Sequence, residues 1–259
     1  MVSGLLIGGL FAYAVVLGGL YFAQGSLIYP APEQAAPVPR GYRQIEVTTA
    51  DGLKLAAVFL PPSPGRKTVV FFHGNGDSWD GAAAANRMIA GAGYGVLLAE
   101  YRGYGANLGK PGEQGFYADG RAVLAWLKTQ GIGAEQTVLV GNSIGSGTAT
   151  QLASETPVAG LAVISGFTSL PDVVAEKISW APTRYLVRDK FDNHAKVGRI
   201  TAPLLLLHGT ADTMIGPEHA QALAQAQPKA RLVLVPGFGH ELAYQDASQQ
   251  ALLDWLVGL

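Results

Sequence analysis

Eight short runs of strand-forming residues, several of them separated by helical segments, constrain the fold of this chain most. The runs cover residues 45–48, 53–60, 68–72, 95–99, 138–140, 161–164, 204–208 and 232–235. Several are continuously apolar, as strands covered on both faces require. The helical segments cover residues 82–92, 115–130, 146–154, 218–225 and 245–256. Such alternation predicts an α/β fold with a mostly parallel sheet, and the Asp51-Gly52 turn predicts an antiparallel hairpin at its start.

The amino-terminal segment predicts a membrane anchor. Residues 5–22 are all aliphatic, aromatic, Ala or Gly, and the first charged residue is Glu33. A bilayer-spanning helix needs about 20 such residues. A cleaved signal peptide with a site near Ala23 and Gly25 is an alternative, although no basic residue precedes the apolar run, and a buried core helix is another. Arg40 and Arg43 weakly favour a cytoplasmic body, so the side of the membrane stays open.

Composition bounds the remaining choices. The expected organisation is an anchor at 1–29, a Pro-rich spacer at 30–44 and one α/β domain at 45–259. Charged residues make up 14% of the 259 residues and the net charge is −1, which excludes a disordered chain and a nucleic-acid binder that relies on a basic surface. The chain has no Cys, so a thiol nucleophile and Cys-type zinc sites are excluded. No metal site or cofactor is expected.

The pentapeptide Gly141-Asn-Ser-Ile-Gly145 is the strongest candidate for chemistry. It follows a predicted strand and precedes a predicted helix, where a nucleophilic Ser143 would occupy a strained turn. Such a turn leaves no room for side chains two residues before and two residues after the nucleophile. A Gly-Ser turn without chemical function is the alternative, because five-residue patterns also occur by chance.

An acid and a base follow Ser143 in the order that this arrangement requires. Asp212 comes after the strand LLLLHG, and His240 comes after the strand RLVLV. Both lie on loops at the carboxyl ends of strands, where an open parallel sheet binds its ligands. The loop after residues 68–72 brings the backbone N–H of Asn75 near the elbow, where it could pair with that of Ile144 as an oxyanion hole. We interpret His73 as a loop-forming residue without an acid partner, and His194, His208 and His219 show no acid-partner pattern.

Five motifs in this order resemble the α/β-hydrolase fold: HGNGD, EYRGYG, GNSIG, LLLLHGTAD and GFGH. The apolar segment followed by QGSLIYP further resembles an amino-terminally anchored group that includes eukaryotic protein depalmitoylases and uncharacterised bacterial proteins. The resemblance implies Ser143 as nucleophile, Asp212 as acid, His240 as base, and the amides of Asn75 and Ile144 as oxyanion hole. Glu100 replaces an Asp usual in that group, and Asn107 and Gly112 replace serines, so a particular substrate cannot be carried over.

The predicted function is hydrolysis of acyl esters or thioesters on lipids or acylated proteins at a membrane. Only about 38 residues separate residue 164 from Pro203, too few for a large lid, so we expect an open cleft. Trp79, Met214, Ile215 and Phe238 are candidates for an acyl pocket, with core or rim packing as the alternative. We expect Arg102 to pair with an acidic neighbour. A serine peptidase of the same fold, and a membrane-tethered binding protein without turnover, are the alternative functions.

Overall fold

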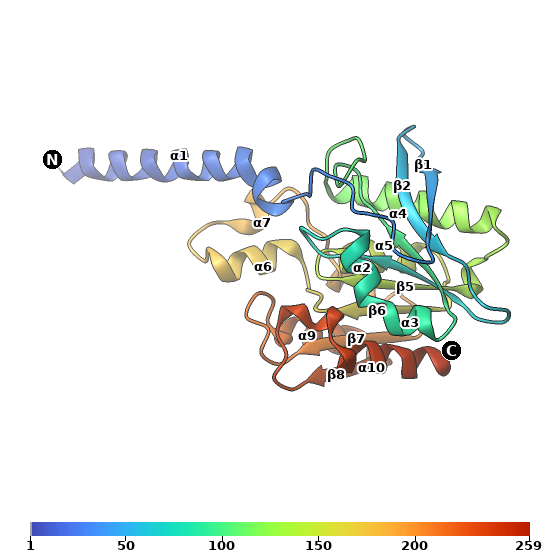
Figure 1. Ribbon diagram of the computed structural model, residues 1–259. Helices are drawn as coiled ribbons and strands as arrows, with labels where there is room; N and C mark the ends of the chain where they lie inside the picture. Colours follow the sequence, from blue (N-terminus) through green and yellow to red (C-terminus); the bar gives the residue numbers. More distant parts are fainter. Residues whose placement is uncertain (1) are drawn as a thin grey trace.

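One eight-stranded sheet organises the computed structural model, which describes residues 2–259 and their side chains from residue 6 onward (Figure 1). Its strands are β1 (Arg43–Thr48), β2 (Lys54–Leu60), β3 (Thr68–Phe72), β4 (Gly95–Ala99), β5 (Thr137–Asn142), β6 (Gly160–Ile164), β7 (Leu204–Gly209) and β8 (Arg231–Val235). They lie in the order β1-β2-β4-β3-β5-β6-β7-β8. The β1–β2 and β2–β4 pairs are antiparallel and all later pairs are parallel, which confirms the predicted hairpin and mostly parallel sheet.

Helices cover both faces of the sheet. One face packs against α2 (Trp79–Ala85), α3 (Arg87–Gly91) and α10 (Asp246–Val257). The other packs against α4 (Glu113–Thr129), α5 (Gly145–Glu155), α8 (His194–Val197) and α9 (Pro217–Ala226). Two short 3-10 helices, η1 (Ala134–Gln136) and η2 (His240–Tyr244), complete these layers. All five residues of β3, β4 and β6 are buried, which explains their continuous apolar character.

The helical prediction for residues 82–92 needs correction, because this region contains two helices. The chain turns helical already at Trp79, after an extended Ser78. Asn86 then leaves helical geometry, with φ −115° and ψ 13°, and ends α2. Its side-chain amide donates to the carbonyl of Ala82 at 2.8 Å, within the helix that it terminates. The competing hydrogen bond of an Asn side chain accounts for the interruption.

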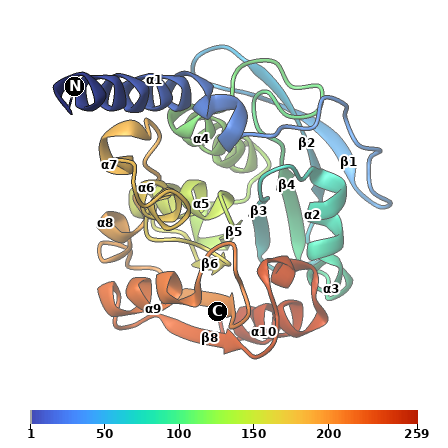
Figure 2. The ribbon, with the colours of Figure 1, turned by 90° about the vertical axis from the view of Figure 1, so that its left-hand side faces the viewer.

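The amino-terminal helix α1 (Val2–Ile28) projects from the body (Figure 1). Its segment Leu6–Ile28 is long and apolar enough to cross a membrane, with mean hydropathy 1.9, a measure that an amino-terminal signal sequence also meets. None of its most apolar window is buried, which contradicts the alternative of a core helix. The helices α6 (Leu170–Lys177) and α7 (Thr183–Leu186), between β6 and α8, lie beside its carboxyl-terminal half (Figure 2).

The Pro-rich segment after α1 lies along the body. The indole N–H of Trp79 donates to the carbonyl of Ala36 at 2.9 Å, and the backbone N–H of Gly105 donates to the carbonyl of Pro32 at 2.8 Å. Both contacts connect this segment to loops at the carboxyl edge of the sheet. The end of α1 is thereby held close to that edge.

Candidate active site

The carboxyl ends of three parallel strands bring the predicted residues together. Ser143 follows β5, Asp212 comes three residues after β7, and His240 begins η2 after β8. Ser143 has φ +52°, the strained conformation expected of a strand-to-helix elbow. A Cβ on Gly141 would meet the carbonyl oxygen of Gly145 at 2.5 Å, and one on Gly145 would collide with the carbonyl of Phe72. The two glycines therefore allow the close backbone approach on which the elbow depends.

Ser143, His240 and Asp212 form a continuous chain of hydrogen bonds. The distance from Ser143 Oγ to His240 Nε2 is 2.9 Å, and the distance from His240 Nδ1 to Asp212 Oδ2 is 2.8 Å. Asp212 is buried, whereas the His240 side chain keeps 22% of its surface exposed. The imidazole thus touches both the hydroxyl and the carboxylate and remains accessible from solvent. This geometry permits a proton to move from the hydroxyl to the ring.

Several donors hold the carboxylate of Asp212 in its charged form. Its Oδ1 accepts the backbone N–H groups of Met214 and Ile215, each at 2.9 Å. His208 Nε2 lies 3.4 Å from Oδ2, an acid contact that the sequence pattern had not indicated. Burial alone would raise the pKa of Asp212, but the contact with His208 and the hydrogen bonds from His240 and Ile215 outweigh it and lower the pKa. Asp212 is therefore ionised throughout the neutral range.

The loop after β3 lies against the elbow. A Cβ on Gly74 would lie 3.5 Å from the Cβ of Ser143. The next residue, Asn75, has its side chain held from two sides: Tyr104 Oη donates to its Oδ1 at 2.6 Å, and its Nδ2 donates to the carbonyl of Ile28. Within residues 2–259, no carbonyl accepts the backbone N–H of Asn75 or that of Ile144. Both groups are free to bind an incoming oxygen.

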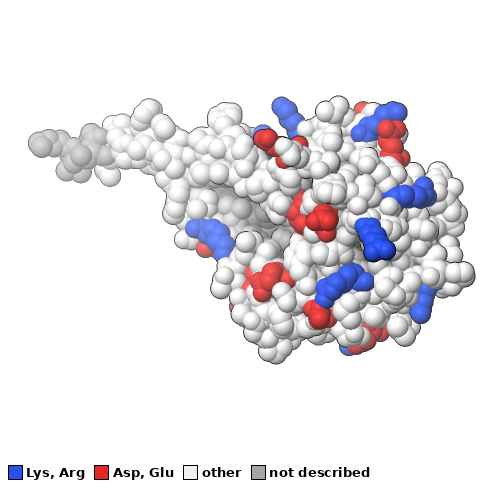
Figure 3. Space-filling model, in the orientation of Figure 1, with Lys and Arg blue, Asp and Glu red and all other residues white. Residues whose placement is uncertain are grey.

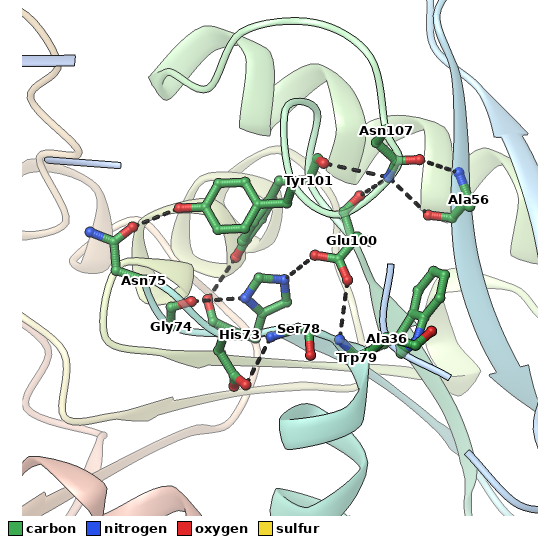
Figure 4. A network of polar contacts seen from close by, with 12 residues as sticks. Ala36, Ala56, His73, Gly74, Asn75, Ser78, Trp79, Glu100, Tyr101 and Asn107 are labelled. Carbon is green, nitrogen blue, oxygen red and sulfur yellow. Dashed lines mark hydrogen bonds and ion pairs between the residues drawn. The ribbon is translucent and has the colours of Figure 1, made fainter. Parts of the chain in front are cut away.

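A buried ion pair lies behind this loop (Figure 4). His73 is fully buried, and its Nε2 lies 2.9 Å from Glu100 Oε1 while its Nδ1 lies 2.8 Å from the carbonyl of Gly74. Both ring nitrogens face acceptors. Burial lowers the pKa of His73, but the hydrogen bond and charge of Glu100 outweigh it, so the net effect is a raised pKa. His73 has a structural role as predicted, yet the prediction that it lacks an acid partner was wrong.

Glu100 connects the loop to the first helix. Its Oε2 accepts the backbone N–H of Trp79, the first residue of α2, at 3.1 Å. The carboxylate therefore reaches both His73 and a helix amino terminus, where negative charge is favourable. Asn107 fixes the other end of this turn, because its side chain accepts from the N–H of Ala56 at 2.7 Å and donates to the carbonyl of Glu100 at 3.2 Å. Glu100 and Asn107, the two residues of this turn at which the sequence departs from the anchored group it resembles, thus belong to one network, which motif comparison alone did not indicate.

The four candidate pocket residues lie in different surroundings. Trp79 and Ile215 are buried in the two apolar clusters of the core, which favours the packing interpretation for both. Phe238 is half-buried, and Met214 is exposed beside Asp212. Only these last two reach the surface around the proposed triad.

The remaining charged candidates have structural partners. Arg102 binds Asp51 at 2.7 Å and Asp119 at 2.8 Å, which confirms the predicted acidic pairing. His219 Nε2 lies 2.9 Å from Glu176 Oε1, so the expectation that it lacks an acid neighbour was wrong. Neither residue belongs to the hydrogen-bonded chain at Ser143.

Comparison with known proteins agrees with the fold. The family model of the α/β hydrolase fold matches residues 67–193, and the model described as serine aminopeptidase, S33 matches residues 171–246. An uncharacterised protein of Mycobacterium tuberculosis is 35% identical over 235 residues, which cover 87% of this chain and 83% of that protein. The chain belongs to the α/β-hydrolase fold family.

Solved structures show the same fold. An esterase of Pyrococcus furiosus superposes with a TM-score of 0.71 at 21% identity, covering 87% of this chain and 95% of that one. The esterase domain of a Rhodothermus marinus protein superposes with a TM-score of 0.62 at 21% identity, covering 84% and 96%. The narrower resemblance to membrane-anchored depalmitoylases stays a prediction.

Proposed function

We propose that this protein is a serine hydrolase that cleaves carboxylic ester or thioester bonds. The observation that carries the proposal is the 2.9 Å contact between Ser143 Oγ and His240 Nε2, extended by Asp212. The esterase names of two structural relatives are in keeping with it. We assign Ser143 as nucleophile, His240 as general base and acid, and Asp212 as the acid that orients the imidazole.

The reaction proceeds in two steps, acylation of Ser143 and hydrolysis of the acyl-enzyme. His240 Nε2 takes the hydroxyl proton while Ser143 Oγ attacks the acyl carbon, and the carbonyl electron pair moves onto oxygen. The N–H groups of Asn75 and Ile144 stabilise that oxyanion. The imidazolium then protonates the leaving oxygen or sulfur, which leaves an acyl-enzyme. Water, deprotonated by His240, attacks the acyl-enzyme, and the serine hydroxyl reforms as the acid departs.

We further propose that residues 1–29 are an uncleaved single-pass anchor, residues 30–44 a spacer and residues 45–259 the catalytic domain. The length and composition of Leu6–Ile28 support the anchor. The buried side chain of Gln24, which accepts a hydrogen bond from the backbone N–H of Arg188 after α7, supports retention of the helix, since cleavage near residue 25 would remove that contact. The proposed localisation is therefore the membrane.

The direct test is the reaction of Ser143. We expect a fluorophosphonate probe to label the full-length protein, and Ser143→Ala to abolish labelling and lower kcat for a p-nitrophenyl ester by roughly 10⁶-fold. Ser154→Ala, on the helix α5 that follows Ser143 and with its hydroxyl hydrogen-bonded to the carbonyl of Gln151, is the control and should label normally. Retained turnover by Ser143→Ala would refute the assignment, and absence of both labelling and turnover in the wild type would favour a binding protein.

A serine peptidase is the second candidate, because the serine aminopeptidase model matches residues 171–246. The same three side chains can cleave amides. A panel of acyl esters, acyl thioesters and aminoacyl amides separates the two. We expect esters or thioesters to have the higher kcat/KM, and the reverse order would assign the protein as a peptidase.

A further inference from the structure

An apolar cavity lies between α1 and the segment 170–190, which we call the α6–α7 lobe. The cavity has a volume of about 200 Å³ and is lined by Leu20, Leu27 and Ile28 of α1 and by Val174, Ile178 and Leu186 of the lobe. Gln24 also borders it, but its amide is engaged: Oε1 accepts the N–H of Arg188 at 2.8 Å and Nε2 donates to the carbonyl of Leu186 at 3.3 Å. The walls of the cavity are therefore aliphatic and suit an apolar ligand, because both polar atoms of the Gln24 side chain are already hydrogen-bonded.

One hydrogen bond links the cavity wall to the loop that carries the proposed oxyanion hole. Ile28 lines the cavity, and its carbonyl accepts the side-chain amide of Asn75. Asn75 is the residue whose backbone N–H we assign to the oxyanion. An acyl chain that extends from a carbonyl at Ser143 past Asn75 thus meets the cavity wall at Ile28.

The lobe lies beside α1 along much of the segment that would cross a membrane. Tyr13 Oη donates to the carbonyl of Trp180 at 3.1 Å, and the two rings meet edge to face with centroids 6.0 Å apart. From Tyr13 to Ile28 the helix rises about 22 Å at 1.5 Å per residue. A hydrocarbon core is about 30 Å thick, so a lobe that follows α1 this far enters the same layer. The cavity between them then opens at the depth of acyl chains.

The exposed aromatic residues of the lobe fit this environment. Trp180 and Tyr185 are 53% and 85% exposed, and Arg184 and Arg188 lie close to them in the sequence. Trp and Tyr are enriched where a membrane meets water, and the long side chain of Arg can extend its charge from the hydrocarbon toward the headgroups. The face seen in Figure 3 is hollowed beneath α1, and the described part of this helix carries no charge.

We infer that this cavity is the acyl-chain site, and that α1 forms one of its walls as well as anchoring the protein. The inference rests on the proposed function and names its substrate class: a long-chain glycerolipid ester taken from the bilayer. The acyl chain of such a lipid already lies in the hydrocarbon, with its ester carbonyl at the headgroup boundary. It passes between α1 and the lobe without entering water, and its carbonyl meets Ser143 at the carboxyl-terminal end of α1.

The test introduces a larger side chain into the cavity, once from α1 and once from the lobe. Full-length protein is reconstituted in phosphatidylcholine vesicles that carry dioleoylglycerol, and p-nitrophenyl butyrate supplies the short-chain reference. We expect Leu20→Trp and Val174→Phe each to lower the ratio of long-chain to short-chain kcat/KM by about tenfold or more, since a pocket that differs by a few methylene groups discriminates on this scale. Fluorophosphonate labelling reports whether each variant is folded.

The matched control is Leu10→Trp, the same change on the exposed part of the same helix. It should keep the wild-type ratio. An unchanged ratio in both cavity variants overturns the inference, as does an equal fall in Leu10→Trp, which would trace the effect to membrane insertion. If the vesicles instead carry an S-palmitoylated peptide and only this substrate is cleaved, the glycerolipid assignment is overturned. If wild type neither hydrolyses butyrate nor reacts with the probe, the proposed function itself fails.

Discussion

Asp212 illustrates how single residues near Ser143 are held in one charge state. Its two oxygens face His240, His208 and the backbone N–H groups of Met214 and Ile215. An amide at this position would place an N–H₂ group against a donor and remove the charge that stabilises the imidazolium. We therefore expect Asp212→Asn to lower kcat by about 10³- to 10⁴-fold with little change in KM. Steady-state kinetics on a p-nitrophenyl ester measures this, and a loss below tenfold would contradict the role of Asp212.

The His73–Glu100 pair makes a pH-dependent prediction about stability. The folded protein raises the pKa of His73, so between the unfolded value of about 6.5 and the folded pKa it binds more protons than the unfolded chain. The stabilisation is thus complete below about pH 6.5 and is lost as pH rises through the folded pKa.

Glu100→Gln tests this dependence, because the amide no longer favours the imidazolium. Thermal unfolding followed from pH 6 to pH 9 should show that the Tm of wild type falls more steeply than that of Glu100→Gln. The exposed Glu135→Gln serves as the control and should follow wild type. Parallel curves for wild type and Glu100→Gln would show that His73 is not protonated.

At the scale of elements, the strand-to-helix turn at Ser143 depends on β3 as much as on its own sequence. The close approach of Gly145 to the carbonyl of Phe72 brings α5 against the end of that strand. A methyl group there forces the two apart, and we expect Gly145→Ala to destabilise the protein by about 1–3 kcal/mol, the usual cost of overpacking. Gly91→Ala is the control: a Cβ at this position meets nothing within 4 Å, so its Tm should stay equal or rise slightly. Equal Tm values for wild type and Gly145→Ala would contradict the packing argument.

The elements themselves were largely predictable, and the exceptions have local causes. Strand-forming runs identified all eight strands, and those of β3, β4 and β6 are continuously apolar because these strands are buried on both faces. The break between α2 and α3 was missed because Asn86 acts through a side-chain hydrogen bond that periodicity does not record. The proximity of Ser143, Asp212 and His240 could also be predicted. Each follows a strand of the parallel part of the sheet, and the carboxyl ends of these strands lie at one edge. Glu100 and Tyr104 reach the loop after β3 through contacts that exist only once β3 and β4 are paired.

At the scale of the whole molecule, hydropathy identified α1 but did not predict where it lies. An apolar helix has the same composition whether it stands free or packs against a lobe. The difference lies in single polar contacts, chiefly those of Gln24 and Tyr13 with the α6–α7 lobe. These contacts join α1 and the α/β body into one packed unit at the edge of the candidate site.

Gln24 therefore offers a measure of how firmly α1 and the lobe are joined. Gln24→Ala leaves the N–H of Arg188 and the carbonyl of Leu186 without their partner, which costs about 1–3 kcal/mol for each group that stays buried. When the lobe separates from α1, water can hydrogen-bond to both groups and part of that cost is avoided. We therefore expect the lobe to separate from α1 more often in Gln24→Ala than in the wild type. Limited trypsin digestion of the full-length protein should then cleave faster after Arg184. Gln221→Ala, an exposed position on α9, should be cleaved at the wild-type rate. If Gln24→Ala is cleaved no faster than this control, the contact does not hold the lobe, and α1 would serve as an anchor alone.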